Sequence, residues 1–117
     1  MDELRVPAGS QVYLGAPAVP LEPEIVAALA ELVDGAPEVT EAHLPQAFVP
    51  GAMSAPAQVL VIVTLDSDRQ PALNRIGPGL GHILPAGRSL DVWPLSPSDP
   101  VLPAVRGADC RIGRHPG

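Results

Sequence analysis

The sequence predicts an α+β fold in which two helices cover one face of a four-stranded antiparallel sheet. Three observations lead to this prediction. Residues 22–34 and 68–84 carry apolar side chains at the three- and four-residue spacing of helices. Four shorter segments show the alternation or the β-branched content of strands. The 16 prolines and 11 glycines cluster between these segments, where turns are expected.

The first strand and the first helix have clear sequence signals. Residues 10–15 alternate between apolar and polar positions, which predicts a strand. Residues 22–34 predict a helix, because Pro23 suits the first turn and Asp34 is followed by Gly35, which can take the left-handed conformation that ends helices.

The middle of the chain predicts two further strands. Residues 39–49 alternate, but Pro45 within them lacks an N–H group, so we expect an edge strand or a bulged one. Residues 58–65 are apolar on both faces and rich in β-branched residues, which predicts the central strand of the sheet.

The second helix is expected to begin at a capping box, in which Ser67 is followed three residues later by Gln70. Pro78 interrupts its apolar pattern, so we expect a kink or two short helices. A fourth strand over residues 89–95 and a short helix within residues 99–107 complete the expected elements.

The resulting order is strand, helix, strand, strand, helix, strand. This is the β-α-β-β-α-β order of ferredoxin-like folds, which place both helices on one face of a four-stranded antiparallel sheet. Each helix has a single apolar stripe, which fits a two-layer sandwich. We expect a leader at residues 1–9, one domain at residues 10–112 and a tail at residues 113–117.

Composition argues against several classes of partner and compartment. The net charge is −6, there is no lysine, and only Tyr13, Phe48 and Trp93 are aromatic, so we expect no nucleic acid partner. The longest purely apolar run, Val59–Val63, is far too short to cross a membrane, and no signal peptide is recognisable. The single cysteine favours a reducing compartment, so we expect a cytoplasmic protein without a membrane partner.

Several segments in combination resemble a known family. They are Val12–Ala18 before the first helix, Pro37–Val39, Ala42–Leu44, Pro85–Gly87 and Leu90–Leu95. Together they are similar to the C-terminal domain of the SseB family, the bacterial enhanced serine sensitivity proteins. The resemblance covers residues 10–112 and implies the fold and a bacterial origin. It implies no catalytic residues.

Cys110 is the strongest candidate for catalysis. A nucleophilic thiol needs a base and an electropositive setting, and Arg106, Arg111, Arg114 and His115 are close in sequence. No local base or helix N-terminus activates this thiol, so we expect a non-catalytic cysteine.

The other candidate sites have simpler explanations. Asp66 and Asp68 offer too few oxygens for Mg²⁺ or Ca²⁺, and a helix cap accounts for them. The three histidines lack metal-ligand spacing, and we expect His43 on a solvated strand face beside Glu41. The glycine-rich residues 77–81 lack the lysine and the preceding strand of a phosphate loop. We therefore expect no catalytic, metal or cofactor site and no cofactor.

The central strand predicts an interaction surface instead. Leu60 and Ile62 point to one face, whereas Val59, Val61, Val63 and Leu65 point to the other, which two helices on one side would leave bare. Its expected residues are Tyr13, Val61, Val63 and Trp93. A second copy of the chain, another protein, or the chain's own ends (residues 1–9 or 97–117) would cover it.

The charges are distributed unevenly along the chain. Residues 1–58 carry a net charge of −7 and residues 59–117 a net charge of +1. This asymmetry is typical of a solvated acidic helix face, or of an acidic patch that docks a basic partner.

We therefore expect a non-enzymatic bacterial protein-interaction or regulatory module that acts as a homodimer or binds another protein. The alternatives are a small-ligand-sensing domain, whose ligand the sequence leaves open, and a small enzyme using Cys110.

Overall fold

The computed structural model describes residues 12–17, 21–51, 53–88 and 90–112. The elements are β1 (Tyr13–Gly15), α1 (Pro23–Asp34), β2 (Glu41–His43), β3 (Gln46–Phe48), β4 (Ala57–Val63), the 3₁₀ turn η1 (Asp66–Asp68), α2 (Arg69–Ile83), β5 (Asp91–Leu95) and α3 (Leu102–Gly107). The predicted α+β class is confirmed. The expected leader at residues 1–9 and tail at residues 113–117 lie outside the described residues.

Strand β4 is the centre of a five-stranded sheet. Strands β2 and β3 pair antiparallel with β4, and β1 pairs antiparallel with β3. Strand β5 pairs with β4 in parallel. The predicted ferredoxin-like, wholly antiparallel arrangement is therefore not confirmed. Helix α2 returns the chain to the end of the sheet where β4 began, which makes β5 parallel to β4, and the short β1 lies at the outside.

Pro45 divides the strand expected over residues 39–49 into β2 and β3. Its carbonyl group accepts a hydrogen bond from the backbone of Val59 at 3.0 Å, so the backbone of β4 pairs across the break. The opposite edge of residues 41–44 is paired with the segment that follows α3. The Leu44 N–H group donates to the carbonyl of Cys110 at 2.9 Å, and that of Ile112 donates to Ala42 at 3.0 Å. The sequence predicts an edge strand or a bulged one here; the structure shows two short strands instead, and β3 pairs with both β1 and β4, so it is not an edge strand.

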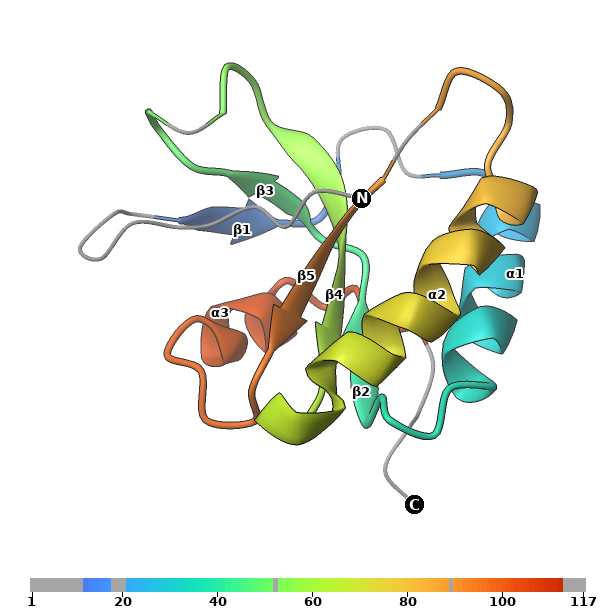
Figure 1. The fold of residues 1–117 in the computed structure, drawn as a ribbon. Coiled ribbons are helices and arrows are strands. Elements are labelled where there is room, and N and C mark those ends of the chain that lie inside the picture. The colour runs from blue at the N-terminus through green and yellow to red at the C-terminus, as the bar shows by residue number, and fades with distance from the viewer. Residues whose placement is uncertain (1–11, 18–20, 52, 89, 113–117) are drawn as a thin grey trace.

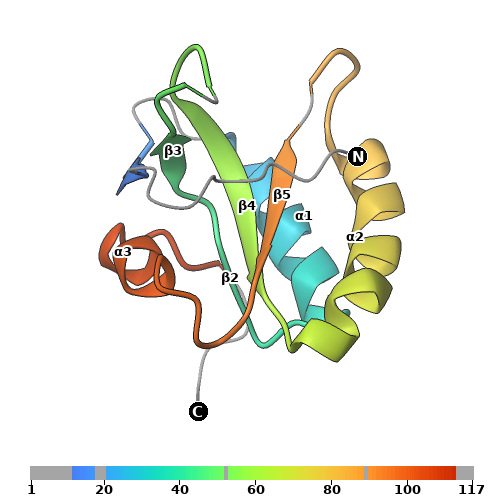
Figure 2. The ribbon, with the colours of Figure 1, turned by 60° about the vertical axis from the view of Figure 1, so that its left-hand side comes forward.

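The molecule has three layers. Helices α1 and α2 cover one face of the sheet, and α3 covers the other (Figures 1 and 2). Leu60 and Ile62 belong to the core beneath α1 and α2, whereas Val59, Val61 and Val63 belong to the core beneath α3. The predicted division of β4 into two apolar faces is confirmed. The predicted two-layer sandwich is wrong because the chain itself covers the second face.

Several helix ends differ from the sequence expectations. The capping box does not form, because Ser67 lies within η1 and no side-chain cap bond is made at the start of α2. Gly35 ends α1 in a right-handed conformation, with φ −80°.

Helix α2 continues through Pro78 as one helix and not as two. The neighbouring Gly79 packs closely against α1: a Cβ atom there would be 2.5 Å from Cδ1 of Leu32. No helix among the described residues has both the length and the apolar character needed to cross a membrane.

Leu29 offers a direct test of the α1 core. Its side chain is fully buried beneath the helix, so Leu29→Ala should lower the free energy of unfolding by about 2–5 kcal/mol. Leu65→Ala is the matched control, because Leu65 is 55% exposed and its truncation should cost less than about 0.5 kcal/mol. Urea denaturation measures both. Equal losses in the two variants would show that α1 does not pack as described.

Candidate functional site

An ion cluster lies beneath α3. The Arg106 guanidinium on α3 donates two hydrogen bonds to the carboxylate of Glu41 on β2, both at 2.8 Å. His43, two residues further along β2, has its Nε2 atom 2.7 Å from the same carboxylate. Glu41 and His43 are both buried. The expectation that these two residues face solvent is therefore wrong.

Strand alternation explains the geometry of this cluster. Residues 41 and 43 point to the same face of β2, and they pair with Val63 and Val61 of β4 on the face that α3 covers. The Arg106 side chain is half exposed and reaches Glu41 from the rim of that cover. The cluster thus links a short helix to a strand 65 residues away in the chain.

Electrostatics holds Glu41 in its ionised form. The hydrogen bonds from Arg106 lower the pKa of this carboxyl group to about 2 from its usual value of 4.5, although burial opposes the shift. An ionised carboxylate has no proton to donate, so His43 Nε2 donates to it. The Nδ1 atom of His43 is buried and has no partner among the described residues. Both carboxylate oxygens accept hydrogen bonds from donors. The cluster therefore holds α3 against the sheet, and the Glu41 carboxylate is a poor general base.

Cys110 follows α3 and is half-buried. Its thiol donates a hydrogen bond to the carbonyl of Ala108 at 3.1 Å. Burial, together with the nearby charge of Asp109, raises the pKa of this thiol. Of the basic residues close in sequence, Arg106 binds Glu41, while Arg114 and His115 lie outside the described residues. The setting favours the thiol over the nucleophilic thiolate.

The other candidate ligands do not converge. The exposed carboxylate of Asp66 lies 3.8 Å from the guanidinium group of Arg69. Asp66 and Asp68 are the first and last residues of the 3₁₀ turn η1. His82 is exposed in the last turn of α2, far in the fold from the buried His43. Within the described residues no three acidic, histidine or cysteine side chains gather as a metal site would require.

Three of the four residues expected on an open interaction surface are buried. Val61, Val63 and Trp93 lie beneath α3, and Trp93 is only 4% exposed. Leu102 and Val105 of α3 cover them, so the chain's own C-terminal part, one of the covers expected from the sequence, lies over this face, and these three residues do not form an open interaction surface. Tyr13 differs, because 53% of its surface is exposed.

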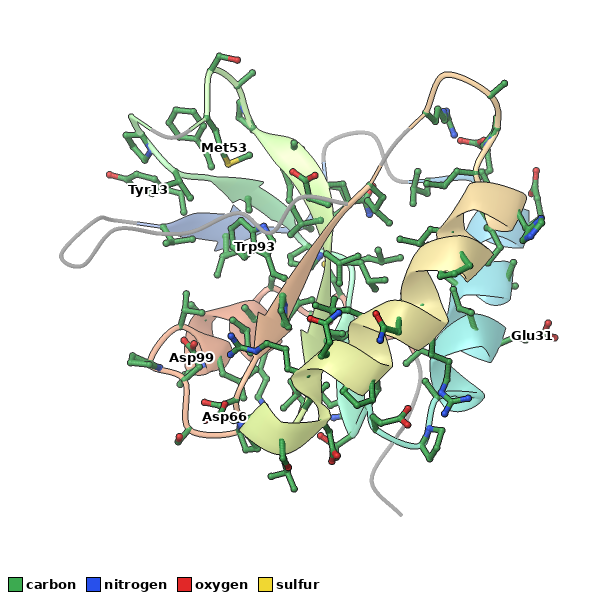
Figure 3. The ribbon with its side chains drawn as sticks, in the orientation of Figure 1. Tyr13, Glu31, Met53, Asp66, Trp93 and Asp99 are labelled. Atoms are coloured by element: carbon green, nitrogen blue, oxygen red, sulfur yellow. The ribbon has the colours of Figure 1, made fainter. Side chains whose placement is uncertain are left out.

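Tyr13 belongs to a part of the sheet that α1 and α2 leave uncovered. It lies directly opposite Phe48 in the β1–β3 pairing, which brings the two aromatic side chains together on one face. Figure 3 shows Tyr13 on the side of the molecule away from α1. We call residues 12–17, 46–51 and 53–58 the wing.

The wing carries no charged side chain. The sequence has no Asp, Glu, Lys, Arg or His between residues 44 and 65, and none between residues 12 and 21. The acidic side chains lie elsewhere, with Glu24 and Glu31 exposed on α1. Sequence reasoning missed this region because it treated these residues only as strands and turns. A count of charges along the chain would have identified it.

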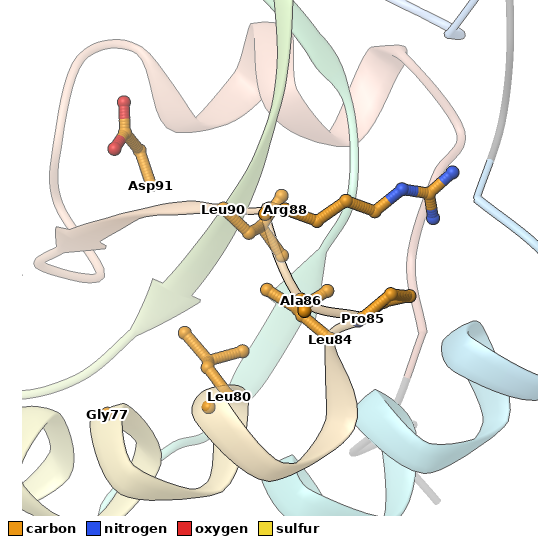
Figure 4. Close-up of a pocket in the computed structure, with 10 residues that line it drawn as sticks. Gly77, Leu80, Leu84, Pro85, Ala86, Arg88, Leu90 and Asp91 are labelled. Atoms are coloured by element: carbon orange, nitrogen blue, oxygen red, sulfur yellow. The ribbon is translucent and has the colours of Figure 1, made fainter.

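A cleft of about 610 Å³ lies where α2 leads into β5 (Figure 4). Its floor is apolar and includes Leu80, Leu84 and Leu90. Arg88 at its rim is paired with Glu22 at 2.9 Å, and the Asp91 side chain points away from Arg88 (Figure 4). The polar groups therefore do not converge on one ligand position, as small-molecule sites require.

The ion cluster predicts a specific pH dependence of stability. The pKa of Glu41 is lower in the folded protein, so its contribution is complete above about pH 5 and is lost as the pH falls towards about 2. The shift corresponds to about 3 kcal/mol. We expect Glu41→Gln to lower the free energy of unfolding at neutral pH by up to that amount, and the difference from the wild type to shrink in acid.

Chemical denaturation at a series of pH values measures this difference. Glu22→Gln is the matched control, because Glu22 also accepts hydrogen bonds from an arginine, Arg88, at both carboxylate oxygens, but its side chain is 43% exposed. Its effect should be small. If the difference in unfolding free energy between Glu41→Gln and the wild type does not change with pH, the ionised Glu41 carboxylate does not stabilise the fold as described.

Cys110 should react slowly with alkylating reagents. Its raised pKa leaves little thiolate at neutral pH, so the rate of reaction with iodoacetamide should be lower than that of a free thiol. The rate should still be rising with pH above about 8.5. Glutathione treated in parallel is the control. A faster reaction than glutathione at neutral pH would show an activated thiol.

Comparisons with known proteins identify the family. No curated protein and no solved structure shows a significant match to this chain. The model of the SseB protein C-terminal domain family matches residues 6–107. This match includes every element from β1 to α3, and it confirms the resemblance seen in the sequence. The chain belongs to the SseB protein C-terminal domain family.

Proposed function

We propose that this domain is a non-enzymatic protein-interaction module of the bacterial cytoplasm, and that its contact surface is the wing. The observation that carries the proposal is the exposed aromatic side chain of Tyr13, set opposite Phe48 in a region without charged residues. Protein interfaces are enriched in aromatic residues and depleted of charged residues at their centres.

The energetics of binding favour this surface over the exposed face of α1. Burying charged groups against a partner costs free energy unless each one is paired. The wing has none to bury, whereas α1 presents the carboxylates of Glu24 and Glu31 to solvent. Tyrosine also supplies a large contact area at a low cost in conformational entropy. Tyr13 therefore has the properties of an interface anchor.

The chemistry of the remaining groups is consistent with a non-enzymatic role. Both oxygens of Glu41 are engaged by donors, and burial raises the pKa of Cys110. These groups hold α3 and its following segment in place. They support the shape of the domain and leave binding to the wing.

Site-specific crosslinking tests this proposal. The photoreactive residue benzoylphenylalanine replaces Tyr13 in one variant and Leu65 in another, and each is irradiated in bacterial cells. Leu65 is the matched control because it is equally exposed, at 55%, and lies beyond the opposite end of β4. We expect a discrete crosslinked species from position 13 and none from position 65. Equal crosslinking at both positions, or none at position 13, would refute the wing as the contact surface.

A further inference from the structure

The uncharged character of the wing points to its partner. In a twofold contact between identical chains, a residue near the symmetry axis faces its own copy, so a charge at the centre of the patch meets a like charge. Patches rich in one sign of charge therefore resist self-association. The wing has no charged residue, although the whole chain carries a net charge of −6.

We propose that the wing binds a second copy of this chain in a twofold dimer, with the Tyr13 and Phe48 side chains of both copies at its centre. The inference rests on the proposed role of the wing as a contact surface. Aromatic pairs in such a contact gain free energy beyond the area that they bury.

The distribution of charge across the fold supports a second copy over a charged partner. Figure 3 shows Tyr13 on one side of the molecule and Glu31 of α1 on the opposite side. Two copies that meet at their wings hold their α1 helices at the far ends of the dimer. Repulsion between the acidic helices is then screened, because they are separated by more than the Debye length of about 8–10 Å. A basic partner would instead be attracted to α1.

The contact differs from the one expected from the sequence. That expectation placed the dimer on the face containing Val61, Val63 and Trp93, which α3 covers. The wing continues the opposite face of the sheet beyond the ends of α1 and α2, since Gln46 and Phe48 alternate in step with Ala42 and Leu44. Only Tyr13 belongs to both surfaces.

Sedimentation equilibrium of the purified chain tests the dimer. We expect the average mass to rise from 12.1 kDa towards twice that value as the concentration increases through the micromolar range. Tyr13→Ser should remain monomeric over the same range, whereas Leu65→Ser should associate like the wild type. Circular dichroism and urea denaturation of each variant are the controls for retention of the fold.

A charge exchange makes the test specific for a twofold contact. Tyr13→Arg and Tyr13→Glu should each abolish association, because like charges would meet across the axis. An equimolar mixture of the two should associate again.

A wild-type mass that stays at 12.1 kDa, or equal association of Tyr13→Ser and the wild type, would overturn the dimer. Failure of the dimer is distinguishable from failure of the proposed function. A position-13 crosslink to a different protein, with monomeric wild type, would retain the wing as a contact surface and reject the second copy as its partner. Self-association that Tyr13→Ser leaves unchanged, with no crosslink at position 13, would reject both.

Discussion

The fold depends on covering a central strand that is apolar on both faces. Val61 and Ile62 are adjacent in β4, point in opposite directions and are both fully buried. A strand of this kind is stable only between two layers. Helices α1 and α2 supply one layer through long apolar stripes, whereas the six-residue α3 supplies the other with only two buried side chains. The ion pair between Arg106 and Glu41 holds this smaller layer in place.

Local patterns in the sequence predict the elements well. The helix over residues 22–34 and the two faces of the strand over residues 58–65 follow from periodicity, and the lack of an N–H group at Pro45 predicts an irregular strand there, although not its division into two strands. Periodicity sets which face a side chain occupies, but it does not choose the neighbouring strand. The parallel pairing of β5 with β4 therefore had no signal in the sequence pattern.

The candidate site also combines features that local patterns predict with features that depend on long-range contacts. Tyr13 was predicted as an interaction residue and is exposed, but Trp93 is buried because a helix that begins at residue 102 packs over it. Glu41 and His43 have the alternation of a solvated strand face, and contacts with α3 and the segment after it, both distant in the sequence, make them internal. Contacts between residues that are distant in the sequence cannot be predicted from the pattern of neighbouring residues. The uncharged wing was readable in principle, since it needs only a count of charges.

The backbone bonds between β2 and residues 110–112 protect the protein against aggregation. An uncovered strand edge presents unpaired N–H and C=O groups to other chains and is a template for intermolecular β-sheet growth. The Leu44 N–H group and the Ala42 carbonyl group instead bind the segment after α3. Arg106 contributes indirectly to this protection, because its ion pair with Glu41 holds α3, the helix from which residues 110–112 extend. The same part of the chain, α3 and the residues that follow it, thus covers both an edge of the sheet and one of its apolar faces.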